Sequence, residues 1–171
     1  MVADRITILR IGADVKLETR PVDPRDFLRG DYVTLDYSIS SLHGGALKEL
    51  AGQGAPVFVR GTPVFVKLSP NHDGFYEAVS VHEAPVEVTN TQVLIRGRVA
   101  WGFCSGDVSG CTLQVRYGIE SYFVPEGEGG KLEAARNQRK LTVVAAVAPT
   151  GRAAIKRLLI DGEPVYDEPW F

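Results

Sequence analysis

Apolar and polar residues alternate along most of this chain, which is the pattern of β-strands that bury one face. The alternation is clearest at residues 32–39, where one face is entirely apolar. That face is formed by Val33, Leu35, Tyr37 and Ile39. The same period of two recurs at 92–104 and 112–120, and these two segments predict a long hairpin around the turn 105–110.

Shorter alternating stretches predict further strands on either side. Residues 5–19 alternate in two pieces, and Gly12 is expected to form a bulge or turn between them. Pro63 restricts the β-prone segment 57–68 to an edge, a bulge or the start of a strand. The remaining strands are expected at 75–82, 141–148 and 153–160, and Asp161-Gly162 signals a closing hairpin.

Helical periodicity is convincing only at residues 131–140, although a single helical turn is also expected at 47–50. Closely spaced strands with one short helix near 131–140 indicate a mainly β protein, built as an antiparallel barrel or sandwich of about eight strands. A parallel sheet would need a helix between successive strands, and the sequence lacks those helices.

Composition restricts the class of protein further. The 171 residues, of which 44% are hydrophobic, predict one domain over residues 1–171 with a substantial core. The net charge is −2 and no run of lysine and arginine occurs, so we expect no nucleic-acid binding. No stretch approaches the roughly 20 apolar residues of a membrane helix, and the first residues are too polar for a signal peptide. A membrane anchor is therefore absent from this chain, which is either cytosolic or begins after a removed anchor.

The densest group of special residues directly precedes the 32–39 alternation. Pro21 and Pro24 exclude the start of a helix there. The nearby carboxylates are candidates for an acid/base or metal site, namely Asp23, Asp26, Asp31 and Asp36. Because arginines are interleaved among them, we interpret the region as a salt-bridged turn and expect no metal. The tripeptide Arg29-Gly30-Asp31 matches an adhesion motif but leads straight into an apolar strand, so integrin binding is not expected.

Two blocks of the sequence stand out as motifs. The first is Gly30-Asp31-Tyr32-x-x-Leu35-x-Tyr37, preceded at residues 21–26 by a Pro-x-Asp-Pro-Arg-Asp lead-in. The second runs from Tyr117 to Gly129. Together they resemble the shared blocks of the GDYXXLXY domain family of bacterial proteins, and the resemblance covers most of the chain. It implies an uncharacterised function and, because members commonly carry an N-terminal transmembrane helix, a place at the extracytoplasmic, periplasmic face of the bacterial membrane.

The sequence contains no phosphate-binding loop, dinucleotide fingerprint, zinc spacing or nucleophile elbow, so we expect no cofactor. The alternative to a binding domain is a β-rich hydrolase related to the serine–lysine enzymes that process signal peptides. Such a site needs a nucleophilic serine and a lysine with a pKa lowered by burial. The candidates for this lysine are Lys67, which lies close to Ser69, and Lys156. We prefer the interpretation of a non-catalytic protein.

We therefore expect a non-catalytic β domain that binds a ligand or a partner, such as a membrane protein. The expected binding surface, or else a structural junction, comprises Arg29, Asp31, Tyr32, Leu35, Tyr37, Tyr122, Phe123, Pro125 and Glu126. The rings of Tyr32 and Tyr37 need polar partners, and Glu120 and Glu126 offer acceptors, so the two blocks should lie side by side. In the structural alternative, Leu35 and Tyr37 belong to the core, and Gly30 and Pro125 serve turns.

The two cysteines, Cys104 and Cys111, flank the turn of the predicted hairpin. Residues at such positions lie opposite each other at a distance that a disulfide can span. A metal site would need further ligands nearby, and redox dithiols usually have a tighter spacing. We predict a structural disulfide and hence an oxidising compartment. The alternative is a pair of buried free thiols in a cytosolic protein.

Overall fold

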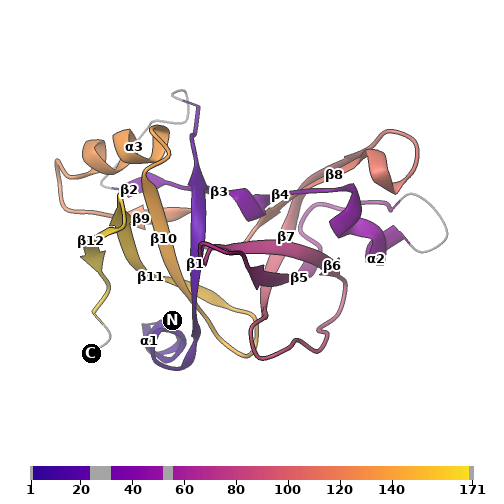
Figure 1. Cartoon of the computed structure of the whole chain (residues 1–171), viewed down its shortest axis with the longest axis horizontal. Helices are drawn as coiled ribbons and strands as arrows, with labels where there is room; N and C mark the ends of the chain where they lie inside the picture. The colour runs from indigo at the N-terminus through magenta and orange to yellow at the C-terminus, as the bar shows by residue number, and fades with distance from the viewer. Residues whose placement is uncertain (1, 24–31, 52–55, 170–171) are drawn as a thin grey trace.

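The computed structural model describes residues 2–23, 32–51 and 56–169, and Figure 1 shows its elements. Within these ranges the chain forms twelve strands and three α-helices. The strands are β1 Ala13–Arg20, β2 Tyr32–Thr34, β3 Asp36–Tyr37, β4 Ser41–His43, β5 Pro63–Pro70, β6 Tyr76–His82, β7 Val93–Cys104, β8 Cys111–Arg116, β9 Ser121–Phe123, β10 Leu141–Val147, β11 Ala153–Ile160 and β12 Glu163–Asp167. The helices are α1 Val2–Ile11, α2 Lys48–Ala51 and α3 Gly129–Asn137.

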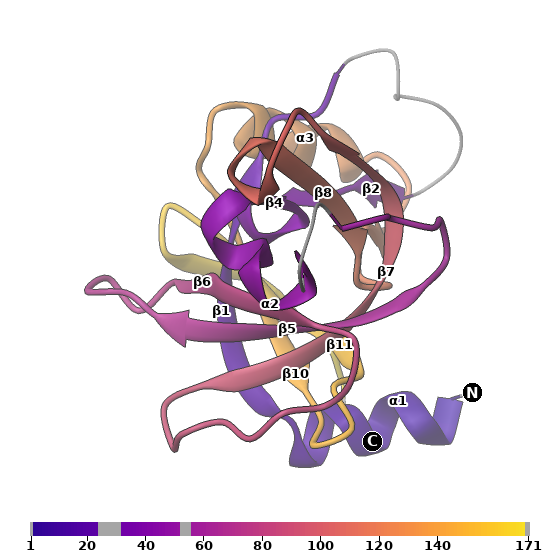
Figure 2. The same ribbon diagram turned by 90° about the vertical axis from the view of Figure 1, so that its right-hand side faces the viewer.

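The strands form two five-stranded sheets and one two-stranded pair. The first sheet has the order β12-β11-β10-β1-β3, the second has the order β4-β8-β7-β5-β6, and β2 pairs with β9. Figure 1 shows the two large sheets side by side along the long axis, with α3 above and α1 below the first sheet, and Figure 2 again shows α3 near the top and α1 at the bottom. Neighbouring strands run antiparallel, so the predicted mainly β, antiparallel fold is confirmed.

One continuous cluster of buried apolar side chains joins the two sheets. Its fully buried members come from strands of both, and include Val15, Leu17, Val66, Leu68, Ile95, Leu113, Val115, Val143 and Leu158. Burying each such side chain stabilises the fold by about 1.5–3 kcal/mol relative to leaving it exposed. The alternation in the sequence therefore records which face of each strand turns toward this shared core.

The single strand predicted over residues 32–39 is divided in the structure, where a 3-10 helix at Ser38–Ser40 separates β3 from β4. Its apolar face is buried throughout, as expected, but the chain pairs successively with three different strands. β2 pairs with β9, β3 with β1 and β4 with β8. Between β2 and β3 the N–H of Leu35 donates to the carbonyl of Glu120 at 2.7 Å. The segment is thus divided because it crosses from one sheet to the other, which also raises the strand count above the predicted one.

The N-terminal prediction was wrong, because residues 2–11 form the helix α1 where a strand was expected for the first piece of 5–19. Two isoleucines, Ile6 and Ile8, are too few to distinguish a strand from a helix. The consecutive residues Ile8 and Leu9 are both buried against a small alanine-lined surface of β10 and β11. The helix ends where Gly12 donates its N–H to the carbonyl of Ile8 at 2.8 Å. A Cβ at Gly12 would lie 2.6 Å from that carbonyl oxygen, so only glycine fits.

The other boundaries shift by a few residues for local reasons. Pro63 is the first residue of β5. The start of a strand is one of the three positions predicted for it, because proline has no N–H to donate. The predicted helix 131–140 instead spans Gly129–Asn137, because Arg139 adopts a left-handed conformation (φ 59°) that turns the chain into β10. The predicted turn around residues 47–50 is helical, and Asp161-Gly162 joins β11 to β12 as expected.

The predicted disulfide is present. Cys104 and Cys111 are direct partners in the β7–β8 register, and an S–S bond of 2.02 Å joins them. The turn between them is held by Asp107, whose carboxylate accepts hydrogen bonds from the N–H and hydroxyl of Ser109. These bonds lower the pKa of Asp107. The disulfide between Cys104 and Cys111 therefore closes the hairpin at its tip.

Removing the disulfide is expected to lower the free energy of unfolding by about 2–3 kcal/mol, because the short loop gains chain entropy in the unfolded state. Urea denaturation of the oxidised protein and of the double variant Cys104→Ala/Cys111→Ala measures the difference. Intact mass should rise by two hydrogens on full reduction. Equal denaturation midpoints, or thiols that react with iodoacetamide before reduction, would contradict the prediction.

Candidate functional site

The two sequence blocks lie side by side, as predicted. β2 and β9 pair in antiparallel register, with Tyr32 opposite Phe123 and Thr34 opposite Ser121. The rings of Tyr32 and Phe123 also contact each other, with centroids 5.8 Å apart. The junction therefore contains backbone pairing and an aromatic contact on its outer side.

Two buried tyrosines connect the blocks in a reciprocal arrangement. The hydroxyl of Tyr37 donates to the carbonyl of Ile119, and the hydroxyl of Tyr117 donates to the carbonyl of Ile39 at 2.6 Å. Each block thus supplies one tyrosine and one acceptor, and in each block the acceptor follows two residues after the tyrosine. Burial raises the pKa of Tyr37 well above its ordinary value, and the negative charges of Glu120 and Asp36 raise it further. Burial, followed by the charge of Glu120, also raises the pKa of Tyr117. We call these two hydrogen bonds the tyrosine clamp.

The structure divides the sequence-predicted site residues into two groups. Leu35, Tyr37 and Tyr122 are buried, so their side chains support the junction. Phe123, Pro125 and Glu126 are exposed, and Tyr32 is half-buried. Phe123 is 75% exposed, which is unusual for a large apolar ring. Arg29 and Asp31 lie outside the described residues.

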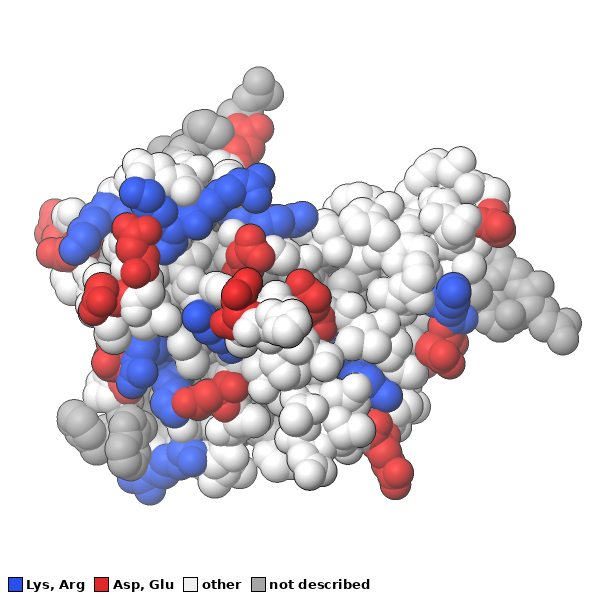
Figure 3. Space-filling model, in the orientation of Figure 1, with Lys and Arg blue, Asp and Glu red and all other residues white. Residues whose placement is uncertain are grey.

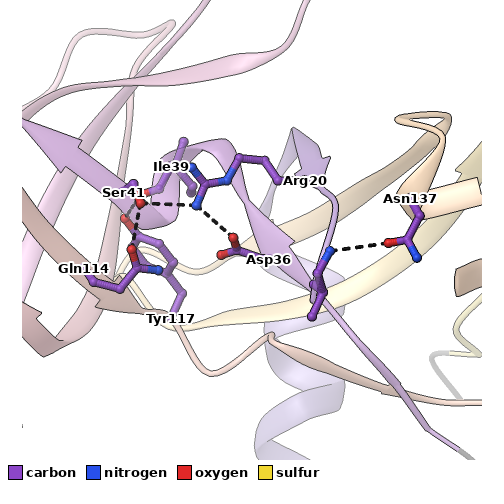
Figure 4. Close-up of polar contacts among 8 residues, drawn as sticks. Arg20, Asp36, Ile39, Ser41, Gln114, Tyr117 and Asn137 are labelled. Atoms are coloured by element: carbon purple, nitrogen blue, oxygen red, sulfur yellow. Dashed lines mark hydrogen bonds and ion pairs between the residues drawn. The ribbon is translucent and has the colours of Figure 1, made fainter. Parts of the chain in front are cut away.

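A polar network crosses the same junction on the other side of β3 (Figure 4). The guanidinium of Arg20 contacts the carboxylate of Asp36 at 2.8 Å and the hydroxyl of Ser41 at 3.2 Å. Ser41 in turn donates to the amide oxygen of Gln114 at 2.7 Å. Asp36 is therefore ion-paired with an arginine that precedes the carboxylate group, whereas the interleaved residues of the predicted salt-bridged turn, 24–31, lie outside the described residues. Among the described residues, no group of three or more His, Cys, Asp or Glu side chains could hold a metal ion.

Arg136 fastens α3 to the junction, a role that sequence reasoning missed. Its side chain is 1% exposed, and its guanidinium donates to the carbonyl of Thr34 at the end of β2. It also donates to the side chain of Asn137. Asn137 in turn accepts the N–H of Val22 at 3.3 Å, the contact drawn at Asn137 in Figure 4. Burial lowers the pKa of Arg136. The helical pattern placed this arginine among polar residues of α3, and nothing in the sequence indicated its burial.

A cleft of about 590 Å³ lies beside the second block. Five arginines line it, and we call it the arginine cleft: Arg60, Arg96, Arg98, Arg116 and Arg152. Glu120 is the single acidic residue among the lining residues, so the lining has a formal charge of +4 in a protein whose net charge is −2. The cleft has the size of a small-molecule site.

The strand register explains why arginines gather there. In β7, Arg96 and Arg98 alternate with the buried Ile95 and Val99, so both arginines face outward. Arg98 lies directly opposite Arg116 of β8. Like charges at directly opposed positions destabilise a sheet, so this pairing has a repulsive cost.

The described carboxylates offer these arginines little compensation. Of the cleft arginines, Arg152 alone forms one of the ion pairs among the described residues, and its partner is Asp4. The carboxylate of Glu120 instead accepts the N–H groups of Tyr117 and Gly118, at 2.5 and 2.9 Å. Its charge therefore serves the turn after β8. The cleft keeps a surplus of positive charge among the described residues.

The chain matches the model of the family described as GDYXXLXY protein over residues 1–158. The chain belongs to the GDYXXLXY family. No curated protein and no solved structure matches it. In this GDYXXLXY protein the signature residues Leu35 and Tyr37 are core residues, and Tyr37 supplies one half of the tyrosine clamp. The two signature residues therefore contribute to a packing junction. The second block contributes to the same junction, and its residues Tyr117, Gly118 and Glu120 also line the arginine cleft.

Sequence reasoning missed the arginine cleft in this GDYXXLXY protein because its arginines come from four separate segments. The available signal was the Arg-x-Arg alternation of Arg96 and Arg98 within an otherwise apolar strand. On the face drawn in Figure 3, by contrast, basic and acidic side chains are interspersed over the half that carries α3, and the half around β5 and β6 is largely uncharged. Net charge and charge runs thus conceal a local surplus.

The residues nominated for a hydrolase are dispersed. Lys156 contacts the carboxylate of Asp14 at 2.7 Å, and neither it nor Lys67 lines the arginine cleft. Lys67 lies opposite Ser80 in the β5–β6 register, and the Ser80 hydroxyl is 2.7 Å from Nε2 of His82. This serine–histidine contact was not predicted. No helix among the described residues is both long and apolar enough to span a membrane.

Proposed function

We propose that this protein is a non-catalytic binding domain that recognises an anionic ligand in the arginine cleft. The observation that carries the proposal is the surplus charge of the cleft: five arginines line it against one glutamate. Guanidinium groups bind carboxylates and phosphates through paired, charge-assisted hydrogen bonds. A ligand that neutralises the opposed Arg98 and Arg116 relieves a repulsion that is present when the cleft is empty.

The position of the cleft supports this proposal. Arg116, Tyr117, Gly118 and Glu120 belong to the end of β8 and the following turn, and all four line the cleft. Because Tyr117 is held by the tyrosine clamp, the turn is fixed to the core instead of being free to collapse into the cleft. A preorganised site loses less conformational entropy when its ligand binds.

We further propose that the domain acts at the extracytoplasmic face of a bacterial membrane, where its ligand belongs to the envelope or to a membrane-protein partner. The disulfide supports an oxidising compartment. The alternative of a serine–lysine hydrolase has less support, because Lys156 is engaged by Asp14 and Lys67 lies away from the cleft lining.

Isothermal titration with inorganic phosphate and citrate tests the binding proposal. We expect saturable binding that weakens about tenfold or more in Arg98→Gln or Arg116→Gln, since a charge-assisted pair contributes about 1.5–3 kcal/mol. Arg139→Gln, an exposed arginine outside the cleft lining, is the matched control and should bind normally. Absence of saturable binding, or equal loss in all three variants, would refute the proposal.

A further inference from the structure

The arginines of the cleft fall into two groups at a fixed spacing. Arg96 and Arg98 are two residues apart on the same face of β7, and a strand rises about 3.3–3.4 Å per residue, so their side chains start about 6–7 Å apart. Each of the two is joined by arginines from other segments. The cleft therefore offers two sites for negative charge along one strand.

The first group surrounds Arg98. Arg116 lies directly opposite it in the register of β7 and β8. The turn that contains Arg60 is held beside it, because Arg98 donates to the carbonyl of Gly61 at 2.9 Å. Gly61 also donates its own N–H to the carbonyl of Val99 at 2.7 Å. This group thus gathers Arg60, Arg98 and Arg116.

The second group surrounds Arg96. The N–H of Arg96 donates to the carbonyl of Gly151 at 2.8 Å, which docks the turn between β10 and β11 onto β7. A Cβ at Gly151 would lie 3.0 Å from the Cβ of Arg96, so the contact is close. The next residue, Arg152, brings the second guanidinium to this end of the cleft, although it also pairs with Asp4.

From this arrangement, and resting on the proposed anion-binding function, we propose that the ligand is a small-molecule bisphosphate whose two phosphates lie about 6–7 Å apart, one on each arginine group. Charge selects phosphate over carboxylate. With the Asp4 carboxylate that pairs with Arg152 counted, the cleft has a formal charge of +3. A phosphate monoester carries about −1.5 to −2 at neutral pH, so two of them balance this charge, whereas two carboxylates leave part of it unbalanced. The cleft volume of about 590 Å³ lies within the range of small-molecule sites.

Titration with a series of synthetic ligands tests the spacing. The series is propyl phosphate, methylenebisphosphonate, 1,3-propanediol bisphosphate and 1,6-hexanediol bisphosphate, measured by calorimetry at fixed ionic strength. We expect the three-carbon bisphosphate to bind at least tenfold more tightly than the others, because it alone spans both groups without strain.

Two variants distinguish the groups. Arg96→Gln should abolish the advantage of the three-carbon bisphosphate over propyl phosphate. Arg98→Gln should weaken both ligands, and Arg139→Gln should weaken neither. This pattern supports two phosphate sites on β7.

The contrary outcomes are separable. If all four compounds bind with equal affinity and depend on Arg98, the bisphosphate inference is wrong and the proposed anion-binding function stands. If none binds saturably, both are wrong. If phosphatidylcholine vesicles containing phosphatidic acid, or a single-stranded oligonucleotide, bind at least tenfold more tightly than the three-carbon bisphosphate, the ligand is a lipid headgroup or a nucleic acid and the small-molecule assignment is overturned.

Discussion

Replacing Tyr37 and Tyr117 together with phenylalanine is expected to lower the free energy of unfolding by about 2–6 kcal/mol. Each substitution keeps the ring in the core but leaves a carbonyl oxygen, that of Ile119 or Ile39, without its tyrosine donor. An unsatisfied buried polar group costs about 1–3 kcal/mol. Urea denaturation monitored by circular dichroism measures the loss. Tyr76→Phe, on the half-buried surface of β6, controls for removing a hydroxyl outside the junction.

The same two tyrosines should make the protein sensitive to base. Burial raises the pKa of both in the folded state, while in the unfolded chain they ionise near pH 10. Folding then favours the protonated form of both tyrosines. Their contribution to the free energy of unfolding is fully present below pH 10 and is lost as the pH rises above it. The expected slope is about −2.7 kcal/mol per pH unit for the two groups. The double phenylalanine variant should lose most of that slope, and an unchanged slope would contradict the buried, protonated state of the clamp.

The second large effect is expected at Arg136. Arg136→Ala should destabilise the protein by about 3–5 kcal/mol, because it opens a cavity and removes the donor to the carbonyl of Thr34. Arg136→Met should cost less, since it fills the volume and avoids the desolvation of a buried cation. Chemical denaturation of both variants, with the exposed Lys131→Ala of the same helix as control, measures the order.

The contrast between the two replacements is what tests the explanation. If alanine and methionine destabilise equally, the hydrogen bond to Thr34 dominates and packing contributes little. If Arg136→Ala falls within about 0.5 kcal/mol of the wild type, the typical range for surface substitutions, Arg136 does not fasten α3 to β2.

Much of the fold follows from the sequence because one physical rule, burial of alternate residues, governs most strands. Val33, Leu35, Tyr37 and Ile39 are buried as their spacing predicts. Alternation does not specify which strand lies alongside, so the division of that segment among three partners could not be predicted. The helix α1 was missed for a related reason: its buried surface is set by contacts with residues near the end of the chain.

The candidate site was predictable where a specific chemical need linked its residues. The disulfide follows from two cysteines that flank one turn, whereas the long-range pairing of the two blocks was inferred from the polar partners that buried tyrosines need; both predictions are confirmed. The arginine cleft depends on the register that places Arg98 opposite Arg116 and on a turn that brings Arg152 near Arg96. Such long-range placement appears in neither net charge nor charge runs.

The pairing of β1 with β10 has a consequence for how the chain folds. β1 begins at Ala13, and its partner strand ends at Val147, so β1 waits for a strand that lies far later in the sequence. A topology with such distant contacts has a high contact order and folds slowly. Until residues 141–147 have emerged, the apolar face and one edge of β1 are uncovered, which exposes the nascent chain to misassociation. The first sheet therefore cannot be completed until β10 has been synthesised, however early β1 emerges.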